Sequence, residues 1–382
     1  MTTCWQPHSA WLPVSPESKR LSMIYDQQIR EDILYMILYG AAAMLALTAC
    51  CYLLLRRANA IAPEVASSPR LRRWAAAFFG SISLSHIWYL PVFYVTFAED
   101  DLLYNLIGAT LDFMTLVPFG IVVLLSMLQD RRRPLWPVFA MMAPIVAVMA
   151  VCVATCDTAL LPVLYTYYLA LAVGLMIYMV REVRRYGRWL RENYADLEHK
   201  ELWQSFVVLA VILLFFGIYT LDPHGLAFKY VTQMNSIILV CYLLWRVETL
   251  SDLSEIPRTS ETPRSSDKNY DFTPLLQKYC IDTQLYLQHG LTVAELARAI
   301  GTNRFYLSQY FSQRGITYNA YINGLRIDHF KRLYHEAVTA EQSFTAQQLA
   351  LECGFHNYRT FSNAFKQQTG QTVTAWMKAA VQ

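Results

Sequence analysis

Residues 291–311, LTVAELARAIGTNRFYLSQYF, decide the fold of the C-terminal part of the chain. Thr292 and Glu295 have the spacing of a capping box, in which each side chain satisfies a backbone amide at the start of a helix. Gly301 can end that helix, because glycine readily adopts the left-handed backbone conformation found there. Asn303 can then cap a second helix. The segment therefore predicts a helix, a short turn and a second helix, which together form a helix-turn-helix unit.

A diverged copy of this unit follows 53 residues later. Its capping box, turn glycine and second cap are Thr345, Gln348, Gly354 and Asn357. The inward faces of the two second helices have i, i+4 spacing, and they consist of Leu307 with Phe311 and of Phe361 with Phe365. A helix expected over 318–337 joins the units and is about 30 Å long, close to the ~34 Å between successive major-groove faces of B-DNA.

Residues 270–382 resemble the DNA-binding domain of the AraC/XylS family of transcription regulators. The matching segments are 291–311, YINGLRIDHFKRLY at 321–334, and LALECGFHNYRTFSNAFKQQTGQTVTAW at 349–376. The resemblance implies that two recognition helices enter adjacent major grooves, often as part of a dimer. It does not extend to the rest of the chain.

Outward positions of the two second helices are the candidate DNA contacts. We expect base contacts from Arg304, Phe305, Ser308 and Gln309 in the first unit, and from Tyr358, Arg359 and Asn363 in the second. Arginine can read guanine, and asparagine or glutamine can read adenine. Arg314 and Lys366 are expected to bind phosphates, which position the protein without specifying sequence. The alternative, that individual members are only solvated surface residues, stays open.

The first 250 residues have the composition of a membrane domain. The chain is 55% hydrophobic and 16% charged, whereas a globular protein has about 25% charged residues, and the apolar excess lies before residue 250. Seven apolar segments are each near the ~20 residues that cross a bilayer. They are 32–55, 74–97, 102–128, 135–155, 159–180, 202–221 and 229–246.

Basic residues alternate between the connections of these segments. The first, third and fifth connections contain five, three and six basic residues, whereas 98–101, 156–158 and 222–228 contain none. Buried helices of a soluble protein do not predict such alternation. By the positive-inside rule, the N-terminus lies outside and everything after residue 246 lies in the cytoplasm. The expected location is the bacterial inner (cytoplasmic) membrane, with lipid as a partner.

These features predict an all-α protein, a polytopic membrane helix bundle followed by a cytoplasmic tandem helix-turn-helix domain. Residues 1–31 are expected to be an extracytoplasmic segment and 32–246 a seven-helix membrane domain. Residues 247–272, rich in Ser, Thr, Pro and charge, are expected to be a flexible linker. Residues 273–382 are expected to bind DNA.

His86 and Asp112 are ionisable residues placed deep in the second and third predicted spans. Such residues are functional candidates in a membrane. They lie at similar depth and could touch, which would make a ligand or proton site. The alternative is a buried hydrogen-bonded strut between helices.

Catalytic motifs are not found in the sequence, which contains no H-E-x-x-H, G-x-S-x-G or phosphate-binding glycine loop. Its eight cysteines form no C-x-x-C pair, so neither a zinc site nor a disulfide framework is expected. We therefore expect no enzyme activity, cofactor or metal. The preferred interpretation is a one-component transcription regulator that binds double-stranded promoter DNA as a homodimer, contacts RNA polymerase and answers an unidentified envelope or membrane-borne inducer. The alternative is a seven-span receptor or transporter whose cytoplasmic helices act through a protein partner.

Overall fold

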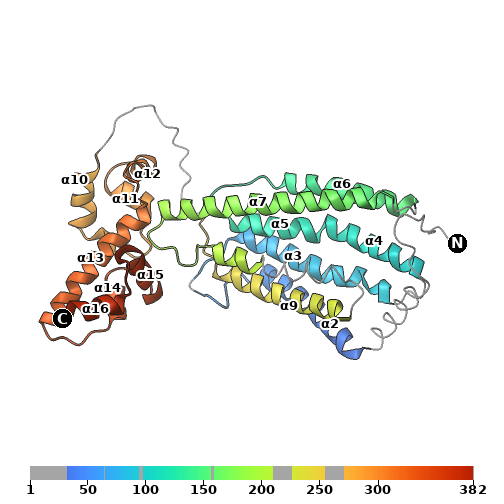
Figure 1. Cartoon of the computed structure of the whole chain (residues 1–382), viewed down its shortest axis with the longest axis horizontal. Helices are drawn as coiled ribbons and strands as arrows, with labels where there is room; N and C mark the ends of the chain where they lie inside the picture. The colour runs from blue at the N-terminus through green and yellow to red at the C-terminus, as the bar shows by residue number, and fades with distance from the viewer. Residues whose placement is uncertain are drawn as a thin grey trace. The chain divides into compact units, whose positions relative to one another are not determined.

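A computed structural model describes residues 32–63, 65–93, 98–155, 159–209, 226–253 and 271–381. Figure 1 shows that these residues form helices and connecting segments. They contain no strand, so the predicted all-α class is confirmed. The chain folds into two compact units: unit 1 comprises Met1–Arg184 with Leu202–Pro257, and unit 2 comprises Arg185–Glu201 with Arg258–Gln382.

Unit 1 is a bundle of long helices that lie alongside one another (Figure 1). α2 packs against α3 and α9, α3 packs against α5, and α4 packs against α6. The helices are α2 (Ile33–Leu55), α3 (Pro69–Trp88), η1 (Leu90–Phe93), α4 (Ala98–Met114), α5 (Leu116–Met127), α6 (Trp136–Thr155), α7 (Leu161–Asn193) and α9 (Leu226–Thr249). Residues of α7 beyond Arg184 belong to unit 2.

Four helical segments of the described chain are long and apolar enough to cross a membrane. They are Ile33–Leu55, Tyr104–Met127, Trp136–Thr155 and Leu161–Asn193. Two further predicted spans fall on α3 and α9, whose polar residues lower their hydropathy: Arg70, Arg72, Arg73 and His86 in α3, and Lys229, Gln233 and Asn235 in α9. Most of the predicted span 202–221, and all of the predicted segment 1–31, lie outside the described residues. Within the described residues, length and hydropathy therefore support four of the seven predicted spans.

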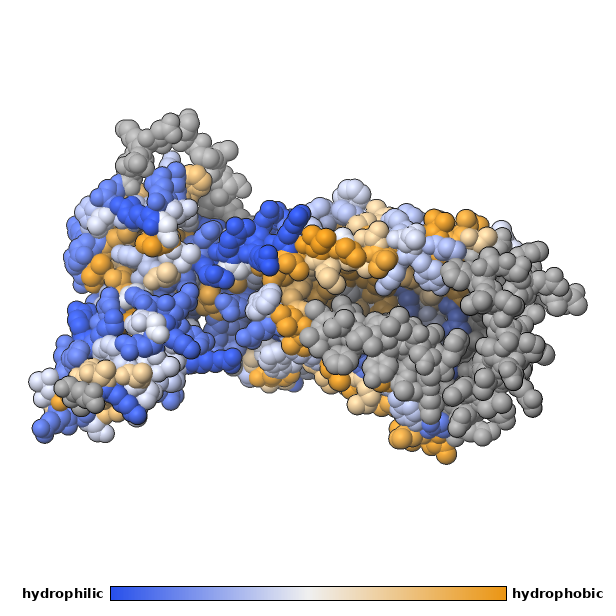
Figure 2. Space-filling model, viewed as in Figure 1, coloured by the Kyte–Doolittle hydropathy of each residue, from blue (hydrophilic) through white to orange (hydrophobic). Residues whose placement is uncertain are grey.

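Apolar side chains cover much of the visible surface of unit 1, whereas hydrophilic residues dominate the visible surface of unit 2 (Figure 2). Ile33 and Leu55 of α2 are 75% and 84% exposed. Along α7, Leu169, Val173 and Met176 are exposed as well. Large contiguous apolar surfaces are unfavourable in water and mark sites of apolar contact, so unit 1 is suited to hydrocarbon surroundings.

The predicted span 102–128 is divided into two helices at Thr115. α4 ends at Met114, and α5 begins at Leu116 after Thr115 adopts φ −127° and ψ −68°. Pro118 has no amide hydrogen to donate to the carbonyl of Met114 four residues earlier, and a proline at such a position kinks or breaks a helix. The Thr115 hydroxyl instead donates to the Leu111 carbonyl at 2.8 Å. Helix α6, in contrast, continues through Pro144.

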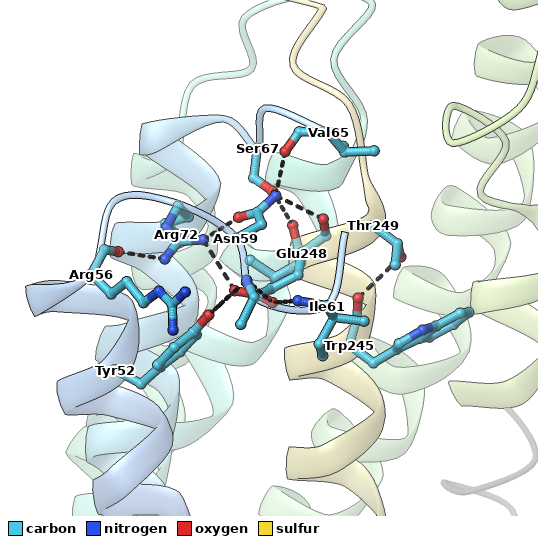
Figure 3. A network of polar contacts seen from close by, with 12 residues as sticks. Tyr52, Arg56, Asn59, Ile61, Val65, Ser67, Arg72, Trp245, Glu248 and Thr249 are labelled. Atoms are coloured by element: carbon cyan, nitrogen blue, oxygen red, sulfur yellow. Dashed lines mark hydrogen bonds and ion pairs between the residues drawn. The ribbon is translucent and has the colours of Figure 1, made fainter. Parts of the chain in front are cut away.

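A buried polar network joins the ends of α2, α3 and α9 (Figure 3). Its centre is Glu248 of α9, whose side chain is 0% exposed. The Glu248 carboxylate accepts hydrogen bonds from the Tyr52 hydroxyl and from the amides of Ala60 and Ile61, the latter at 3.0 and 2.9 Å. Arg72 of α3 lies 3.6 Å from the same carboxylate. Three chain segments, α2, the loop after it and α3, thus satisfy one buried charge.

Asn59 continues this network across the loop between α2 and α3 (Figure 3). Its Nδ2 donates to the Glu248 carbonyl at 2.8 Å, and its Oδ1 accepts from Arg72 at 2.7 Å. Arg72 also donates to the carbonyl of Arg56 at 2.6 Å. The end of α9 is therefore fastened to the rest of unit 1.

The chain after α9 stays packed for several residues. Leu250 is fully buried. Gln129 donates to the Ser251 carbonyl at 3.0 Å and accepts from the Leu253 amide at 2.7 Å, while the Asp252 amide donates to the Ala66 carbonyl at 2.7 Å. The first residues of the predicted linker are thus held on unit 1, and its residues 254–270 lie outside the described chain.

Unit 2 contains short helices arranged around two hydrophobic cores. The helices are α10 (Thr273–Leu276), the π-helical turn η2 (Gln277–Ile281), η3 (Leu285–Leu287), α11 (Val293–Ala299), α12 (Arg304–Gln313), α13 (Tyr318–Thr339), α14 (Ala346–Glu352), α15 (Tyr358–Thr369) and α16 (Val373–Val381). Helix α13 contributes Ile322 to the first core and Phe330 to the second.

Glu248→Ala should strongly destabilise unit 1. The substitution leaves the Arg72 guanidinium buried beside no described carboxylate, and breaking a buried ion pair costs about 3–5 kcal/mol. Glu248→Gln retains an acceptor for the two loop amides and should cost less. Thermal unfolding of the full chain in detergent micelles measures both effects, and equal melting temperatures for Glu248→Ala and the unsubstituted protein would contradict the role given to this network.

Candidate DNA-binding interface

The first helix-turn-helix unit consists of α11 and α12. Thr292 Oγ1 accepts from the Glu295 amide at 3.2 Å, and Glu295 accepts from the Thr292 amide at 2.8 Å, so the predicted capping box is confirmed. Gly301 has φ +76° in the turn. Asn303 caps α12 by accepting from the Tyr306 amide at 3.1 Å. Each predicted local signal therefore forms as expected.

The second unit, α14 and α15, repeats this geometry. Thr345 and Gln348 form the second capping box, with hydrogen bonds of 3.1 and 3.0 Å between side chains and backbone amides. Asn357 caps α15 by accepting from the Thr360 amide at 2.8 Å. Gly354 has φ +87°, and a Cβ added to it would lie 2.4 Å from the Leu287 carbonyl oxygen. Glycine is needed here both for the backbone angle and for this close approach.

Helix α13 connects the two units. Its 22 residues correspond to about 33 Å of helix. The inward residues of the recognition helices pack against opposite halves of it, and Phe330 lies 4.5 Å from Phe361 between ring centroids. Leu307, Phe361 and Phe365 are 0% exposed. The two recognition helices are thus held by one continuous scaffold.

Arg326 stands at the middle of α13 and is 0% exposed. Its guanidinium donates to the carbonyls of Tyr286 and Gln288 at 2.7 and 2.8 Å and to Asp196 Oδ1 at 2.9 Å. Its carbon Cζ lies 5.4 Å from the centroid of the Phe355 ring in the second helix-turn-helix unit. Sequence analysis did not single out Arg326 or Asp196. The position of Arg326 on the apolar face of α13, at i, i+4 spacing from Ile322 and Phe330, indicates in the sequence that this charge needs a buried partner. The sequence around Asp196 contains no comparable indication.

The predicted base contacts of the first helix-turn-helix unit, all on α12, differ in exposure. Phe305 is 50% exposed, Gln309 is exposed, and Ser308 is half-buried. Arg304 is half-buried as well, and burial lowers its pKa against the opposing influence of Tyr194 and Glu192 nearby. The first turn of α12 therefore lies near the end of α7 and the residue that follows it.

In the second helix-turn-helix unit, Arg359, Asn363 and Lys366 are exposed on α15. Tyr358 is half-buried and packs beside Phe361, with 5.8 Å between ring centroids. These positions leave the three exposed side chains available to a partner, whereas Tyr358 contributes mainly to the second core.

Arg314, a predicted phosphate contact, is exposed but has internal partners. Its guanidinium stacks on the Tyr310 ring at 3.7 Å and pairs with Asp271 at 3.0 Å. The pair lowers the pKa of Asp271, after the larger effect of hydrogen bonding from Thr273. Arg314 would have to share or leave these contacts to reach a phosphate.

The structure does not join His86 and Asp112, the predicted sensor pair, by a hydrogen bond. His86 of α3 contacts the Ile82 carbonyl through Nδ1 at 2.8 Å and Gln233 of α9 through Nε2 at 2.9 Å. Both contacts join a ring nitrogen to an oxygen, since Nε2 faces Gln233 Oε1. A neutral His86 can donate to only one of them, and donation from Nδ1 then requires the Gln233 amide to be turned so that its nitrogen donates to Nε2. Asp112 of α4 accepts instead from Ser85 at 3.3 Å.

Two buried polar atoms near Asp112 lack hydrogen bonds in the described part of the chain. They are Asp112 Oδ1 and Trp88 Nε1, and although no hydrogen bond of standard geometry forms at either atom, the Trp88 side chain lies close enough to interact with the Asp112 carboxylate. His86 links α3 to α9 and Ser85 links α3 to α4, so hydrogen bonds around both residues of the predicted pair connect neighbouring helices.

Comparison with known proteins supports the C-terminal domain. A family model described as a helix-turn-helix domain matches residues 296–379. The match includes both recognition helices, and it supports the AraC-type helix-turn-helix domain predicted from the sequence. Searches of curated proteins and of solved structures found no match to the chain. The matched domain is that of a DNA-binding regulator and points away from an enzyme.

Gly354→Ala should destabilise unit 2 more than Gly301→Ala. Both residues have positive φ, which costs a residue with a side chain about 1–2 kcal/mol. A Cβ at Gly301 meets nothing within 4 Å, whereas a Cβ at Gly354 collides with the Leu287 backbone. Unfolding of the two full-length variants, followed side by side, tests the difference, and an equal loss of stability would show that the backbone can move aside.

Proposed function

We propose that this protein is a membrane-embedded one-component transcription regulator that binds promoter DNA sequence-specifically through its two helix-turn-helix units. The observation that carries the proposal is the presence, in one chain, of two complete helix-turn-helix units and of apolar helices long enough to cross a bilayer. Such a chain brings sensing and DNA binding together without a phosphorylation step.

We propose seven spans, with the N-terminus outside and the DNA-binding domain in the cytoplasm of a bacterial inner membrane. Helices α3 and α9 are more polar than the other spans, but α3 packs against α9. His86 and Gln233 contact each other between them. Polar residues are tolerated inside a membrane when they face the bundle interior and pair there. This pairing supports α3 and α9 as interior spans.

In the proposed complex, the second helix-turn-helix unit contacts DNA through Arg359 and Asn363 of α15, which are exposed and suited to base edges. Phe305 and Gln309 offer the corresponding surface of α12, with Arg304, Ser308 and Tyr358 as partly covered neighbours. Lys366 would bind phosphate, and Arg314 could do so after leaving Asp271. We propose that two copies bind together, because tethering in the membrane raises their effective concentration, and that bound copies contact RNA polymerase.

We propose the region around His86 and Asp112 as the place where an inducer acts. Asp112 and Trp88 interact without a hydrogen bond of standard geometry at Asp112 Oδ1 or Trp88 Nε1, so a polar ligand that entered between them would meet one acceptor and one donor. The neighbouring contacts join three helices, since His86 reaches α9 and Ser85 reaches α4. A ligand that changes these contacts would alter the packing of α3.

Insertion of the chain can be tested with a reporter enzyme that is active only outside the cytoplasm. Fusions after residues 100, 157 and 224 should be active, and fusions after residues 57, 132 and 382 should be inactive, because basic connections remain inside. Expression of every fusion is checked by immunoblot. Activity after residue 382, or inactivity after residue 157, would contradict the proposed orientation.

DNA binding can be tested by enriching duplexes from a randomised pool with the full chain in detergent micelles. On the enriched duplex, Arg359→Ala should weaken binding by about 1–3 kcal/mol and relax sequence preference, because a base contact is lost. Lys366→Ala should weaken binding to all duplexes alike and reduce the salt dependence by about one ion.

Lys278→Ala is the matched control for this measurement, since Lys278 lies over the Tyr279 ring in η2 and should leave affinity within about twofold. Failure to enrich any duplex would overturn the proposed function. Equal effects of all three substitutions would overturn the assigned contacts.

A further inference from the structure

Residues 192–200, at and after the end of α7, pack as part of unit 2 and not of unit 1. Tyr194 forms an antiparallel bridge with Thr292, the residue that caps α11 of the first helix-turn-helix unit. The Ala195 amide donates to the Leu291 carbonyl at 3.2 Å. Asn319 of α13 donates to the carbonyl of Ala195. Tyr194 and Ala195 are 3% and 1% exposed, so this short segment belongs to the first core.

Asp196 anchors the segment. Its side chain is 1% exposed and faces Arg326, which is 0% exposed, at 2.9 Å. Asp196 Oδ2 also accepts from the Gly290 amide at 2.8 Å and lies 3.7 Å from His356 Nε2. Among the described residues, Asp196 is the carboxylate that pairs with Arg326. A buried pair with these additional hydrogen bonds is a firm attachment.

One carboxylate beside this anchor contacts the residue that caps α15, and a second lies within electrostatic range of the start of α12. Glu198 accepts a hydrogen bond from the side chain of Asn357, the residue that caps α15. Glu192 and Tyr194 act electrostatically on Arg304, the first residue of α12. The Glu198 side chain is 30% exposed and makes fewer contacts than Asp196, so its contact is the more easily released.

The position of these carboxylates matters because recognition helices approach DNA with their N-terminal residues. DNA carries one negative charge for about every 1.7 Å of helix axis. Carboxylates near both N-termini repel that charge, and Glu198 occupies the side chain of Asn357, which would otherwise face the nucleic acid. DNA and the docked segment therefore compete for the same helix ends.

We propose that residues 192–200 are an autoinhibitory clasp, anchored by Asp196 on Arg326, which holds Glu198 against the cap of α15 and Glu192 near the start of α12. The proposal rests on the proposed function, because it assigns regulation to the same DNA-binding surface. Opening of the Glu198 contact exposes the α15 cap, while the Asp196 anchor keeps the segment attached to unit 2.

The clasp continues directly from a predicted membrane span. α7 runs without interruption from Leu161 to Asn193. Within unit 1, Glu182 of α7 is held by Arg131 at 2.8 Å and by Arg133 at 2.6 Å. A rotation or shift of α7 in response to a signal is thereby passed through the helix to Glu192 and onward to Glu198, with no need for a second protein.

The test compares the affinity of full-length variants in detergent micelles for the enriched duplex. Glu198→Gln keeps the shape of the side chain and removes its charge, so it should bind about three- to tenfold more tightly, and Glu192→Gln with Glu198→Gln at least as tightly. Glu341→Gln is the matched control, because Glu341 is an exposed carboxylate of the same unit. Thermal unfolding confirms that each variant folds.

Hydrogen exchange supplies a readout that a charge effect alone would not move. The amides of Lys200 and Glu201 donate to the Leu197 carbonyl, and their exchange should become faster when the enriched duplex saturates the unsubstituted protein. Unchanged or slower exchange would overturn the clasp, as would a Glu198→Gln affinity equal to or weaker than that of Glu341→Gln. Absence of DNA binding by every form would instead refute the proposed function.

Discussion

The guanidinium of Arg326 is enclosed by protein, and the arrangement of unit 2 follows from the need to satisfy it. A buried charge costs several kcal/mol unless its hydrogen bonds are met with good geometry. Here the partners come from separate places in the chain: the carbonyls of Tyr286 and Gln288, the carboxylate of Asp196 and the ring of Phe355. Each partner must be in position for the charge to be tolerated. One side chain therefore fixes α13 against η3 and the residue after it, against the second helix-turn-helix unit and against the segment after α7.

Such a connection makes the two recognition helices parts of one rigid body. The contact of Gly354 with the Leu287 backbone adds a second junction between the halves of unit 2, and α13 passes through both cores. The spacing between α12 and α15 within one copy is then set by the fold. A signal could act on DNA binding by changing access to these helices, as in the proposed clasp, or by changing how two copies pair. It has little means of changing the internal spacing.

The local structure of unit 2 could be predicted because its signals lie close together in the sequence. Thr292 and Glu295 are three residues apart, and Gly301 is needed wherever that helix must end. The contact of Arg326 with Asp196 joins residues 130 positions apart, and nothing near Asp196 in the sequence points to a partner. The exposure of the predicted DNA contacts could not be predicted either, because it also depends on residues far away in the sequence. The partial cover of Arg304 depends on a distant segment that the sequence places only in a connection between spans.

Hydropathy describes unit 1 incompletely for a related reason, since it scores each residue without regard to its neighbours in the fold. His86 lowers the hydropathy of α3 but is only 8% exposed, where it contacts Gln233 of α9 and lies against the Tyr39 ring at 4.7 Å. Arg326 is equally out of place on the apolar face of α13. In both units, a polar residue within an apolar stripe marks the position of a tertiary partner. The sequence reveals that a partner is needed, and only the folded chain reveals which residue supplies it.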